Sequence, residues 1–565
     1  MGETIQRNQA ADALVATAER ALAAGDLNGA FAAYKACLAQ HRDHPGAVAG
    51  MGLFLARHGE AATATQLLSR AMELADADLR ARVAPALAGL LAELSPRAWH
   101  RQLDADLNAC FAATTVEPQG LARVTAETLL LKQGGFDGST AALEAMGGDP
   151  LWLAFLSRCV NVSAEMEAGL NAVRAALLAV EDMEGETLRA LVCALGLSGF
   201  ASEYAAQVPS GAPSEASDAV GLIASMFRPL TVIEATALGQ DGPMQAQLVL
   251  RTVTEPERER TLRETLPTLT PEGEDAVSVA VREQYEANPY PRWSAPPAPS
   301  PRALRDAVVA LPGLDRRAFG EQAQRLLVAG CGTGFEPIDL ARMDRSLNIT
   351  AMDLSRASLA HGARVADELG LTNVRFVQGD ILALDLVEER FDIVTSTGVI
   401  HHMARPQDGL AKLAGVTRPG GVIRLGLYSE RARALVRLAH DVIVERGWRA
   451  TDEDIRAFRA YVLALPDSEP LAALKQSADF YSLSGCRDLV FHVQEHRYTP
   501  PQLAELVEGA GLRLVGFEAP PEAIGRFREM FGAADSLDLN LWDRLEAQHP
   551  TLFAGMYHLW AQKPV

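Results

Sequence analysis

A glycine-rich stretch after an apolar run carries the clearest chemical signal in the sequence. The run RLLVAG (325–330) leads directly into Cys331-Gly332-Thr333-Gly334. Glycines allow the backbone to turn tightly between a strand and a helix and to approach a ligand closely. Asp353 ends the next apolar run about 20 residues further on, where a carboxylate can accept hydrogen bonds from ribose hydroxyl groups. The spacing therefore predicts a ribose-containing ligand at two neighbouring strand ends.

Two more motifs narrow the choice among folds that bind such ligands. Gly379-Asp380 follows the third apolar run, and Arg418-Pro419-Gly420-Gly421 precedes the fifth. Together with GCGTG in place of GxGxxG, this set resembles the class I S-adenosylmethionine-dependent methyltransferases over about 280–565. A nicotinamide enzyme and a degenerate binding domain are the alternatives. The Asn/Asp-Pro-Pro-Tyr/Phe signature of methylation at amide or exocyclic amino nitrogens does not follow the fourth run.

The resemblance implies a set of residues that would bind S-adenosylmethionine. Asp353 would hold the ribose hydroxyls, Asp380 would accept from the adenine amino group, and Ile381 would pack on the ring. Thr397 and the residues that follow it would lie beside the sulfonium. The full predicted set is Gly330, Cys331, Gly332, Gly334, Asp353, Leu354, Asp380, Ile381, Thr397, Tyr285, Tyr290 and Arg292.

An aromatic segment, YEANPYPRW (285–293), precedes the glycine-rich motif. Its two prolines favour an extended backbone that displays three aromatic rings and one arginine. Arg292 could pair with the methionine carboxylate of the cofactor, and Tyr285 or Tyr290 could lie against the sulfonium. The alternative is that the rings only attach this segment to the sheet.

Histidines supply the candidate catalytic groups. His402 follows the fourth predicted strand, and the segment HVQEH (492–496) ends a long insertion. The spelling HxxEH occurs in a class of zinc proteases, but Thr499-Pro500-Pro501 follows at once and a continuous helix is not expected, so we predict no metal site. We expect a general base among His402, His496, His492 and Glu495. A structural role is the alternative, both for the 492–496 polar groups and for at least one of His401 and His402, which would then only cap the end of the strand.

The elements that must position these residues alternate between strand and helix from about residue 322. This rhythm predicts a doubly wound α/β sheet, Rossmann-like, with helices on both faces. Seven strands are expected, at 325–330, 348–353, 374–380, 391–398, 420–428, 512–519 and 557–564.

We predict that the N-terminal half of the chain is helical. Gly25 and Gly59 are 34 residues apart, and so are Ala30 and Ala64, which resembles the tetratricopeptide repeat. We therefore predict three regions: repeats at 1–90, a mostly helical domain at 91–275, and the methyltransferase at 276–565 with a helical insertion at 429–498. Pro-rich linkers are expected at 208–217 and 294–302.

The composition argues against several classes of protein. The 565 residues carry a formal net charge of −20, so the chain lacks the basic footprint of a nucleic-acid binder. It contains no apolar stretch long enough to span a membrane and no secretory signal is apparent. The six cysteines are scattered, as in reduced cytoplasmic proteins.

These observations predict a cytoplasmic enzyme that transfers a methyl group from S-adenosylmethionine to an O, N or C nucleophile. The helical repeats favour a protein acceptor or protein partner, or a homodimer, whereas the insertion favours an enclosed small-molecule acceptor. A repeat scaffold that binds S-adenosylmethionine without catalysis is the third hypothesis. The sequence selects no acceptor.

Overall fold

A computed structural model describes residues 2–180, 183, 185–208, 221–239, 241–269, 275–291, 293, 295–296, 303–320 and 325–565. Arg292 and most of both predicted linkers lie outside these residues. The chain divides into two compact units, residues 1–201 with 208–248 and residues 202–207 with 249–565. None of the described helices combines the length and the apolar character needed to cross a bilayer.

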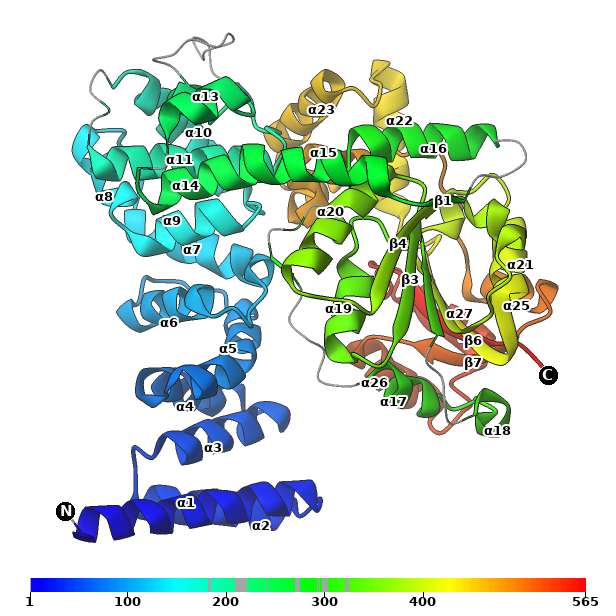
Figure 1. The fold of residues 1–565 in the computed structure, drawn as a ribbon, viewed down its shortest axis with the longest axis horizontal. Helices are drawn as coiled ribbons and strands as arrows, with labels where there is room; N and C mark the ends of the chain where they lie inside the picture. Colours follow the sequence, from blue (N-terminus) through cyan, green and yellow to red (C-terminus); the bar gives the residue numbers. More distant parts are fainter. Residues whose placement is uncertain are drawn as a thin grey trace. The chain divides into compact units, whose positions relative to one another are not determined.

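In its described residues, the first unit consists of helices and one short 3₁₀ helix, η1. Figure 1 shows α1 to α6 stacked in series along the chain. The bounds are α1 Gly2–Ala23, α2 Leu27–Gln40, α3 Pro45–Arg57, α4 Ala61–Leu74, α5 Ala77–Ala92, α6 Arg101–Ala112, η1 Pro118–Leu121, α7 Ala122–Gln133, α8 Thr140–Gly147, α9 Pro150–Arg158, α10 Ala164–Leu178, α11 Glu186–Ala201, α12 Gly221–Ala224, α13 Val232–Leu238 and α14 Pro243–Val249.

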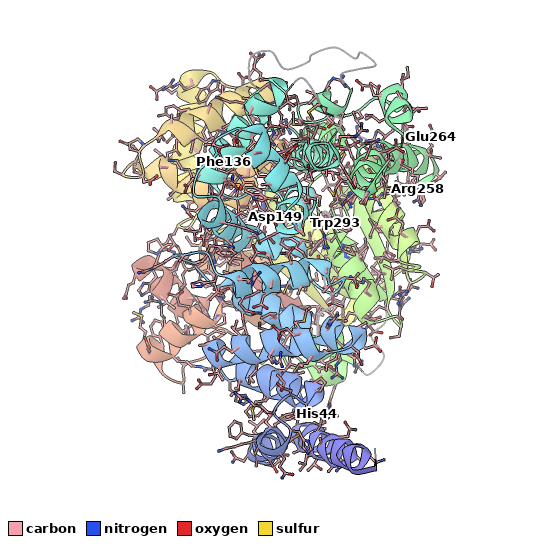
Figure 2. The ribbon with its side chains drawn as sticks, turned by 90° about the vertical axis from the view of Figure 1, so that its left-hand side faces the viewer. His44, Phe136, Asp149, Arg258, Glu264 and Trp293 are labelled. Atoms are coloured by element: carbon pink, nitrogen blue, oxygen red, sulfur yellow. The ribbon has the colours of Figure 1, made fainter. Side chains whose placement is uncertain are left out.

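Local sequence explains where these helices begin and how closely they pack. Gly25 and Gly59 occupy the turns between α1 and α2 and between α3 and α4. A Cβ on Gly52 would lie 2.7 Å from the side chain of Leu68, so the small residue allows α3 to approach α4. Asp149, labelled in Figure 2, caps α9 by accepting a hydrogen bond from the amide of Leu151.

The second unit contains an eight-stranded sheet in the order β1-β4-β3-β2-β5-β6-β8-β7. The strands β1 to β6 run parallel, and β8 pairs antiparallel with both β6 and β7. The bounds are β1 Thr268–Leu269, β2 Arg325–Ala329, β3 Asn348–Asp353, β4 Val374–Gly379, β5 Phe391–Thr397, β6 Thr417–Leu427, β7 Arg513–Glu518 and β8 Tyr557–Gln562.

The α/β class is confirmed, but the predicted number of seven strands is wrong. The additional strand, β1, pairs with the edge of the sheet through Thr268 opposite Gln378 and Leu269 opposite Gly379. Two residues are too few to show the alternation of apolar and polar side chains by which a strand is recognised in sequence.

Helices cover both faces of the sheet. Figure 1 shows α19 and α20 on one side of it and α21 and α25 on the other. The helices of this unit are α15 Glu255–Thr265, α16 Ala276–Ala287, α17 Leu304–Val309, α18 Arg316–Phe319, α19 Phe335–Met343, α20 Arg356–Glu368, α21 Pro406–Val416, α22 Ala434–Arg446, α23 Asp452–Ala464, α24 Leu483–Val490, α25 Pro500–Gly509, α26 Pro521–Phe531 and α27 Leu539–Gln548.

Two elements outside the central sheet matter for the site. Arg258 of α15, labelled in Figure 2, forms ion pairs with Asp367 and Glu368, which attaches α15 to α20. The insertion after β6 supplies α22, α23 and α24, and its two ends meet where Ser429 and Tyr498 form an isolated bridge. The insertion therefore begins and ends beside the carboxyl end of β6.

Candidate active site

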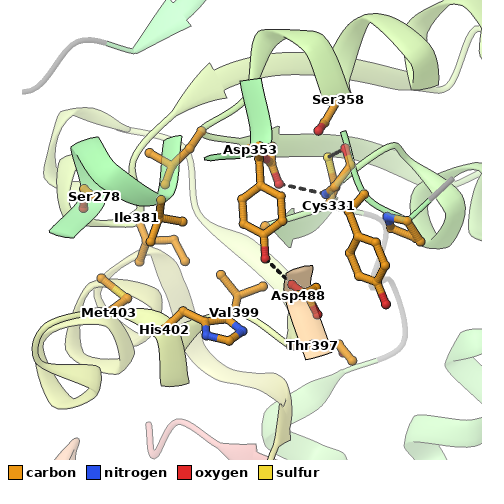
Figure 3. Close-up of a pocket in the computed structure, with 18 of the residues that line it drawn as sticks. Ser278, Cys331, Asp353, Ser358, Ile381, Thr397, Val399, His402, Met403 and Asp488 are labelled. Carbon is orange, nitrogen blue, oxygen red and sulfur yellow. Dashed lines mark hydrogen bonds between the residues drawn. The ribbon is translucent and has the colours of Figure 1, made fainter. Parts of the chain in front are cut away.

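A cavity of about 300 Å³ lies at the carboxyl ends of the parallel strands, where doubly wound sheets bind their ligands. Residues from β3, β4 and β5, the loops after β2 and β5, helix α16 and helix α24 of the insertion line it. Figure 3 shows Asp353 and Ser358 toward one end, and His402, Val399 and Asp488 toward the other. Of the predicted cofactor-binding residues, the cavity is lined by Gly330, Cys331, Gly332, Asp353, Leu354, Asp380, Ile381, Thr397, Tyr285 and Tyr290.

The glycine-rich loop follows β2 directly, and Gly332 and Gly334 are required to be glycine for two different reasons. At Gly332, φ is +53° and a Cβ would lie 2.7 Å from the carbonyl oxygen of Tyr290, so any side chain would strain the loop and push its cover away. Gly334 does not line the cavity. A Cβ there would lie 2.9 Å from Gly362 of α20, so Gly334 serves helix packing instead.

Acidic side chains lie at the carboxyl ends of β3 and β4, on the cavity wall. Asp353 accepts hydrogen bonds from the amides of Gly332 (2.8 Å) and Ser355 (2.9 Å). Burial raises the pKa of Asp353, and these amides oppose the rise. Asp380 accepts from the amide of Leu382 at 2.8 Å. Half-buried carboxylates held in place by backbone amides fit a ligand that presents hydroxyl and amino groups, as the ribose and adenine of S-adenosylmethionine do.

Helix α16 and the aromatic segment after it form another wall. Val277, Val281 and Tyr285 are spaced by four residues, which places them on one face of α16, and all three line the cavity. The carboxylate of Glu286 accepts from the amides of Arg356 (2.6 Å) and Ala357 (3.1 Å), so α16 is attached to the start of α20.

The same segment is attached to the glycine-rich loop. Thr333 donates a hydrogen bond to the carbonyl of Pro291 (2.5 Å) and accepts one from the indole of Trp293 (2.9 Å). Trp293, labelled in Figure 2, packs edge-on against Phe335 and His361. Tyr290 and Pro291 line the cavity, whereas Trp293 holds the segment in place.

His402 lines the far end of the cavity, and its hydrogen bond fixes its tautomer. Its Nδ1 lies 2.7 Å from the carbonyl oxygen of Gln494, which only accepts, so Nδ1 carries the proton and Nε2 has a free lone pair. Burial lowers the pKa of His402 to about 4, so the ring is neutral near pH 7. The ring of His492 stacks on it with centroids 3.5 Å apart, and burial also lowers the pKa of His492 to about 4.

The HVQEH segment is irregular and scatters its side chains. Glu495 forms an ion pair with the buried Arg433, and the ring of His496 hydrogen-bonds to Gln494 at 2.9 Å. Neither of them lines the cavity. Of the four predicted catalytic residues, the structure thus places His402 on the cavity wall and His492 directly behind it. His401 is fully buried against His402 and Tyr428.

Other cavity residues carry weaker sequence signals. Asp488, on α24, lines the cavity from within the insertion and accepts a hydrogen bond from the hydroxyl of Tyr285 at 2.5 Å. Two more cavity residues flank strands: Tyr428 directly follows β6, and Met556 directly precedes β8. The four-residue spacing of Val277, Val281 and Tyr285 is visible in the sequence and could have indicated a shared helix face. Nothing local in the insertion distinguishes Asp488 from its neighbours.

A possible metal set also occurs here. His402, Asp488 and His492 are buried with their nearest ligand atoms within 4.8 Å of one another, the one such group among the described residues. However, Nδ1 of His492 accepts from the amide of Gln494 (3.2 Å), so its proton lies on Nε2, which faces the hydroxyl of Tyr285 at 3.2 Å. The partners therefore favour a hydrogen-bonded chain over metal ligation.

Comparison with known proteins identifies the domain. Residues 321–453 match the family model described as a methyltransferase domain. The chain is 29% identical over 293 residues to an uncharacterized protein of Synechococcus sp., covering 48% of this chain and 68% of that protein. It is 35% identical over 162 residues to the malonyl-[acyl-carrier protein] O-methyltransferase of Enterobacter lignolyticus, covering 28% of this chain and 55% of that enzyme.

Among solved structures, PKMT2 from Rickettsia typhi matches with 16% identity and a TM-score of 0.36, over 47% of this chain and 52% of that one. This chain thus spans between about half and about two thirds of the length of these three proteins. The second unit carries an S-adenosylmethionine-dependent methyltransferase domain.

Proposed function

We propose that the protein transfers a methyl group from S-adenosylmethionine to a nucleophile held at the His402 end of the cavity. One observation carries this proposal: the glycine-rich loop, Asp353 and Asp380 line the same cavity as the free lone pair of His402. The cofactor, when bound, supplies an electrophilic methyl group on a sulfonium. Such a displacement needs an acceptor atom aligned at about 3–3.5 Å and, for O–H or N–H acceptors, a group that takes the proton.

The chain's own residues would divide this work. Asp353 and the loop amides would bind the ribose side of the cofactor, and Asp380 with Ile381 would bind the adenine. The aromatic segment over Gly332 would exclude water from the reacting end. His402 would accept the proton through Nε2, because the carbonyl of Gln494 holds the other ring proton in place.

The acceptor is proposed to be a protein recruited by the helices of the first unit, read as tetratricopeptide-like repeats, in a cytoplasmic setting. Stacked helical pairs present extended surfaces that bind peptides or proteins. The competing proposal is a small metabolite, which the cover provided by α24 of the insertion favours. A homodimer built on the first unit is compatible with either acceptor.

Transfer of tritiated methyl groups to a lysate of the source organism tests the proposal. The lysate is separated into macromolecular and small-molecule fractions after incubation with the full-length protein. Label in the macromolecular fraction supports the protein acceptor, and label only in small molecules overturns it. The variant His402→Gln should transfer methyl groups about 10²-fold or more slowly, the range for loss of a general base. Replacement of the exposed His440 by Gln is the matched control.

A further inference from the structure

The acceptor end of the cavity carries buried negative charge. Asp488 is 7% exposed, lines the cavity, and forms no ion pair with any described residue. Asp479 lies nearby, and its carboxylate accepts a hydrogen bond from the hydroxyl of Tyr290 at 2.9 Å. Burial raises the pKa of both carboxyl groups, and each raises the pKa of Tyr290 through its charge. The carboxylate of Asp488 therefore faces a small, poorly solvated space, and the carboxylate of Asp479 binds the hydroxyl of Tyr290, which also lines that space.

The nearby cation, Arg433, balances only part of this negative charge. Arg433 is buried and forms its ion pair with Glu495, which also pairs with Arg497. Its guanidinium also lies 3.9 Å from the ring centroid of Tyr428, on the edge of the same space. Arg433 lowers the pKa of both Asp479 and Asp488 through its charge, but among the described residues neither carboxylate forms an ion pair.

Aromatic rings complete this end of the cavity. Tyr285, Tyr290 and Tyr428 all line it, and the hydroxyls of the first two donate to Asp488 and Asp479. The faces of aromatic rings attract cations, and they do so more strongly when water is excluded. Carboxylates behind a set of aromatic rings form a recognition surface for an ammonium group. The same surface would repel a carboxylate acceptor and gives a neutral hydroxyl no electrostatic advantage.

We propose that the acceptor is an amine, which binds as an ammonium between Asp488 and the rings of Tyr285, Tyr290 and Tyr428. This inference rests on the proposed function, because it names the substrate class of that same site. Figure 3 shows Asp488 and His402 at the end of the cavity away from Asp353, which is where an acceptor must enter if Asp353 holds the ribose.

The proposed step balances without a further reactant. The ammonium gives one proton to Nε2 of His402, and the freed nitrogen lone pair forms a bond to the methyl carbon. The carbon–sulfur bond breaks with its electron pair remaining on sulfur, which leaves an N-methylammonium and S-adenosylhomocysteine.

The chemical form of the transferred methyl group tests the proposal. Products of tritiated transfer to the lysate are divided into base-released methanol, neutral compounds, and acid-stable compounds retained on a cation-exchange resin. We expect the label in the retained N-methyl fraction. Label released as methanol, label in neutral compounds, or no retained label while S-adenosylmethionine still binds would overturn the amine assignment. Absence of S-adenosylmethionine binding would instead overturn the proposed function.

Binding provides a readout independent of turnover. Hexylamine, hexan-1-ol and hexanoate are titrated into the full-length protein saturated with S-adenosylhomocysteine. We expect the amine to bind at least tenfold more tightly than the other two, and Asp488→Asn to remove that preference. The exposed Asp385→Asn is the matched control. Equal binding of the three probes, no binding of hexylamine, or a preference that survives Asp488→Asn would overturn the proposal.

A second binding measurement distinguishes an ammonium acceptor from the sulfonium of the cofactor, which is the other cation proposed to enter this cavity. S-Adenosylmethionine carries that charge and S-adenosylhomocysteine does not. We expect Asp488→Asn to change the affinity for either molecule by less than twofold. A selective loss of S-adenosylmethionine affinity would assign Asp488 to the sulfonium and overturn the proposal.

Discussion

Acidification should destabilise the methyltransferase unit through His402. Burial holds the pKa of His402 at about 4 in the folded protein, against 6.5 for an ordinary histidine. Between these values the unfolded chain binds a proton that the folded chain does not. The stability due to neutral His402 is therefore fully present above pH 6.5 and is lost as the pH falls toward 4.

The size of this effect follows from the two pKa values. Over the full range the difference of about 2.5 pKa units corresponds to roughly 3 kcal/mol. Between pH 7.5 and pH 5.0, where only part of the range is crossed, one such histidine lowers the free energy of unfolding by about 2 kcal/mol. Burial is the main cause of the lowered pKa of His402, and the hydrogen bond to the carbonyl of Gln494 acts in the opposite direction.

Urea unfolding of the full-length protein at the two pH values measures this loss. Wild type, His402→Gln and the exposed-site control His440→Gln are compared by tryptophan fluorescence. Wild type and the control should each lose about 2 kcal/mol more than His402→Gln. An identical pH dependence in all three proteins would refute the reasoning, as would an NMR titration of His402 with a midpoint near 6.5.

Three further predictions concern the glycine-rich loop, the aromatic segment and the cysteines. Gly332→Ala should weaken S-adenosylmethionine binding, measured by calorimetry, at least tenfold. The control Gly370→Ala, at a position with φ of +60° and nothing within 4 Å of an added Cβ, should change the affinity less than twofold. Equal losses in the two variants would contradict the close approach of Tyr290 to Gly332. Trp293→Phe removes the hydrogen bond to Thr333 and should cost about 1 kcal/mol, seen as a lower Tm; an unchanged Tm would contradict this. The six cysteines are all buried, so a thiol reagent should label the protein only after unfolding, Cys331 included, because burial raises its pKa; rapid labelling of the native protein would contradict this.

Local patterns made most of the sheet and the cofactor end predictable. Each of the seven expected strands is a short apolar run that ends in a turn signal, and the glycine-rich loop and Asp353 are fixed by the strands they follow. Asp353 and Asp380 could be assigned to a cavity because parallel strands place their carboxyl ends at one edge. Gly334 shows the limit of that reasoning, since its neighbour across the fold, Gly362, decides its role.

The acceptor end was much less predictable because its residues meet only through tertiary packing. His402 and His492 are 90 positions apart in the sequence, yet their rings stack at 3.5 Å. Asp488 comes from a helix in an insertion with no periodic signal that points to the cavity. The HxxEH spelling suggested a unit of polar groups, but the irregular backbone separates Glu495 and His496 from the cavity.

The measurement that tests the central claim most directly is calorimetric binding of S-adenosylmethionine to the full-length protein. Wild type should bind it, and Asp353→Asn should weaken binding roughly tenfold or more, since hydrogen bonds to a charged group contribute about 1.5–3 kcal/mol. The exposed Asp385→Asn should leave the Kd within twofold. No binding by wild type, or a Kd that Asp353→Asn leaves unchanged, would contradict the account.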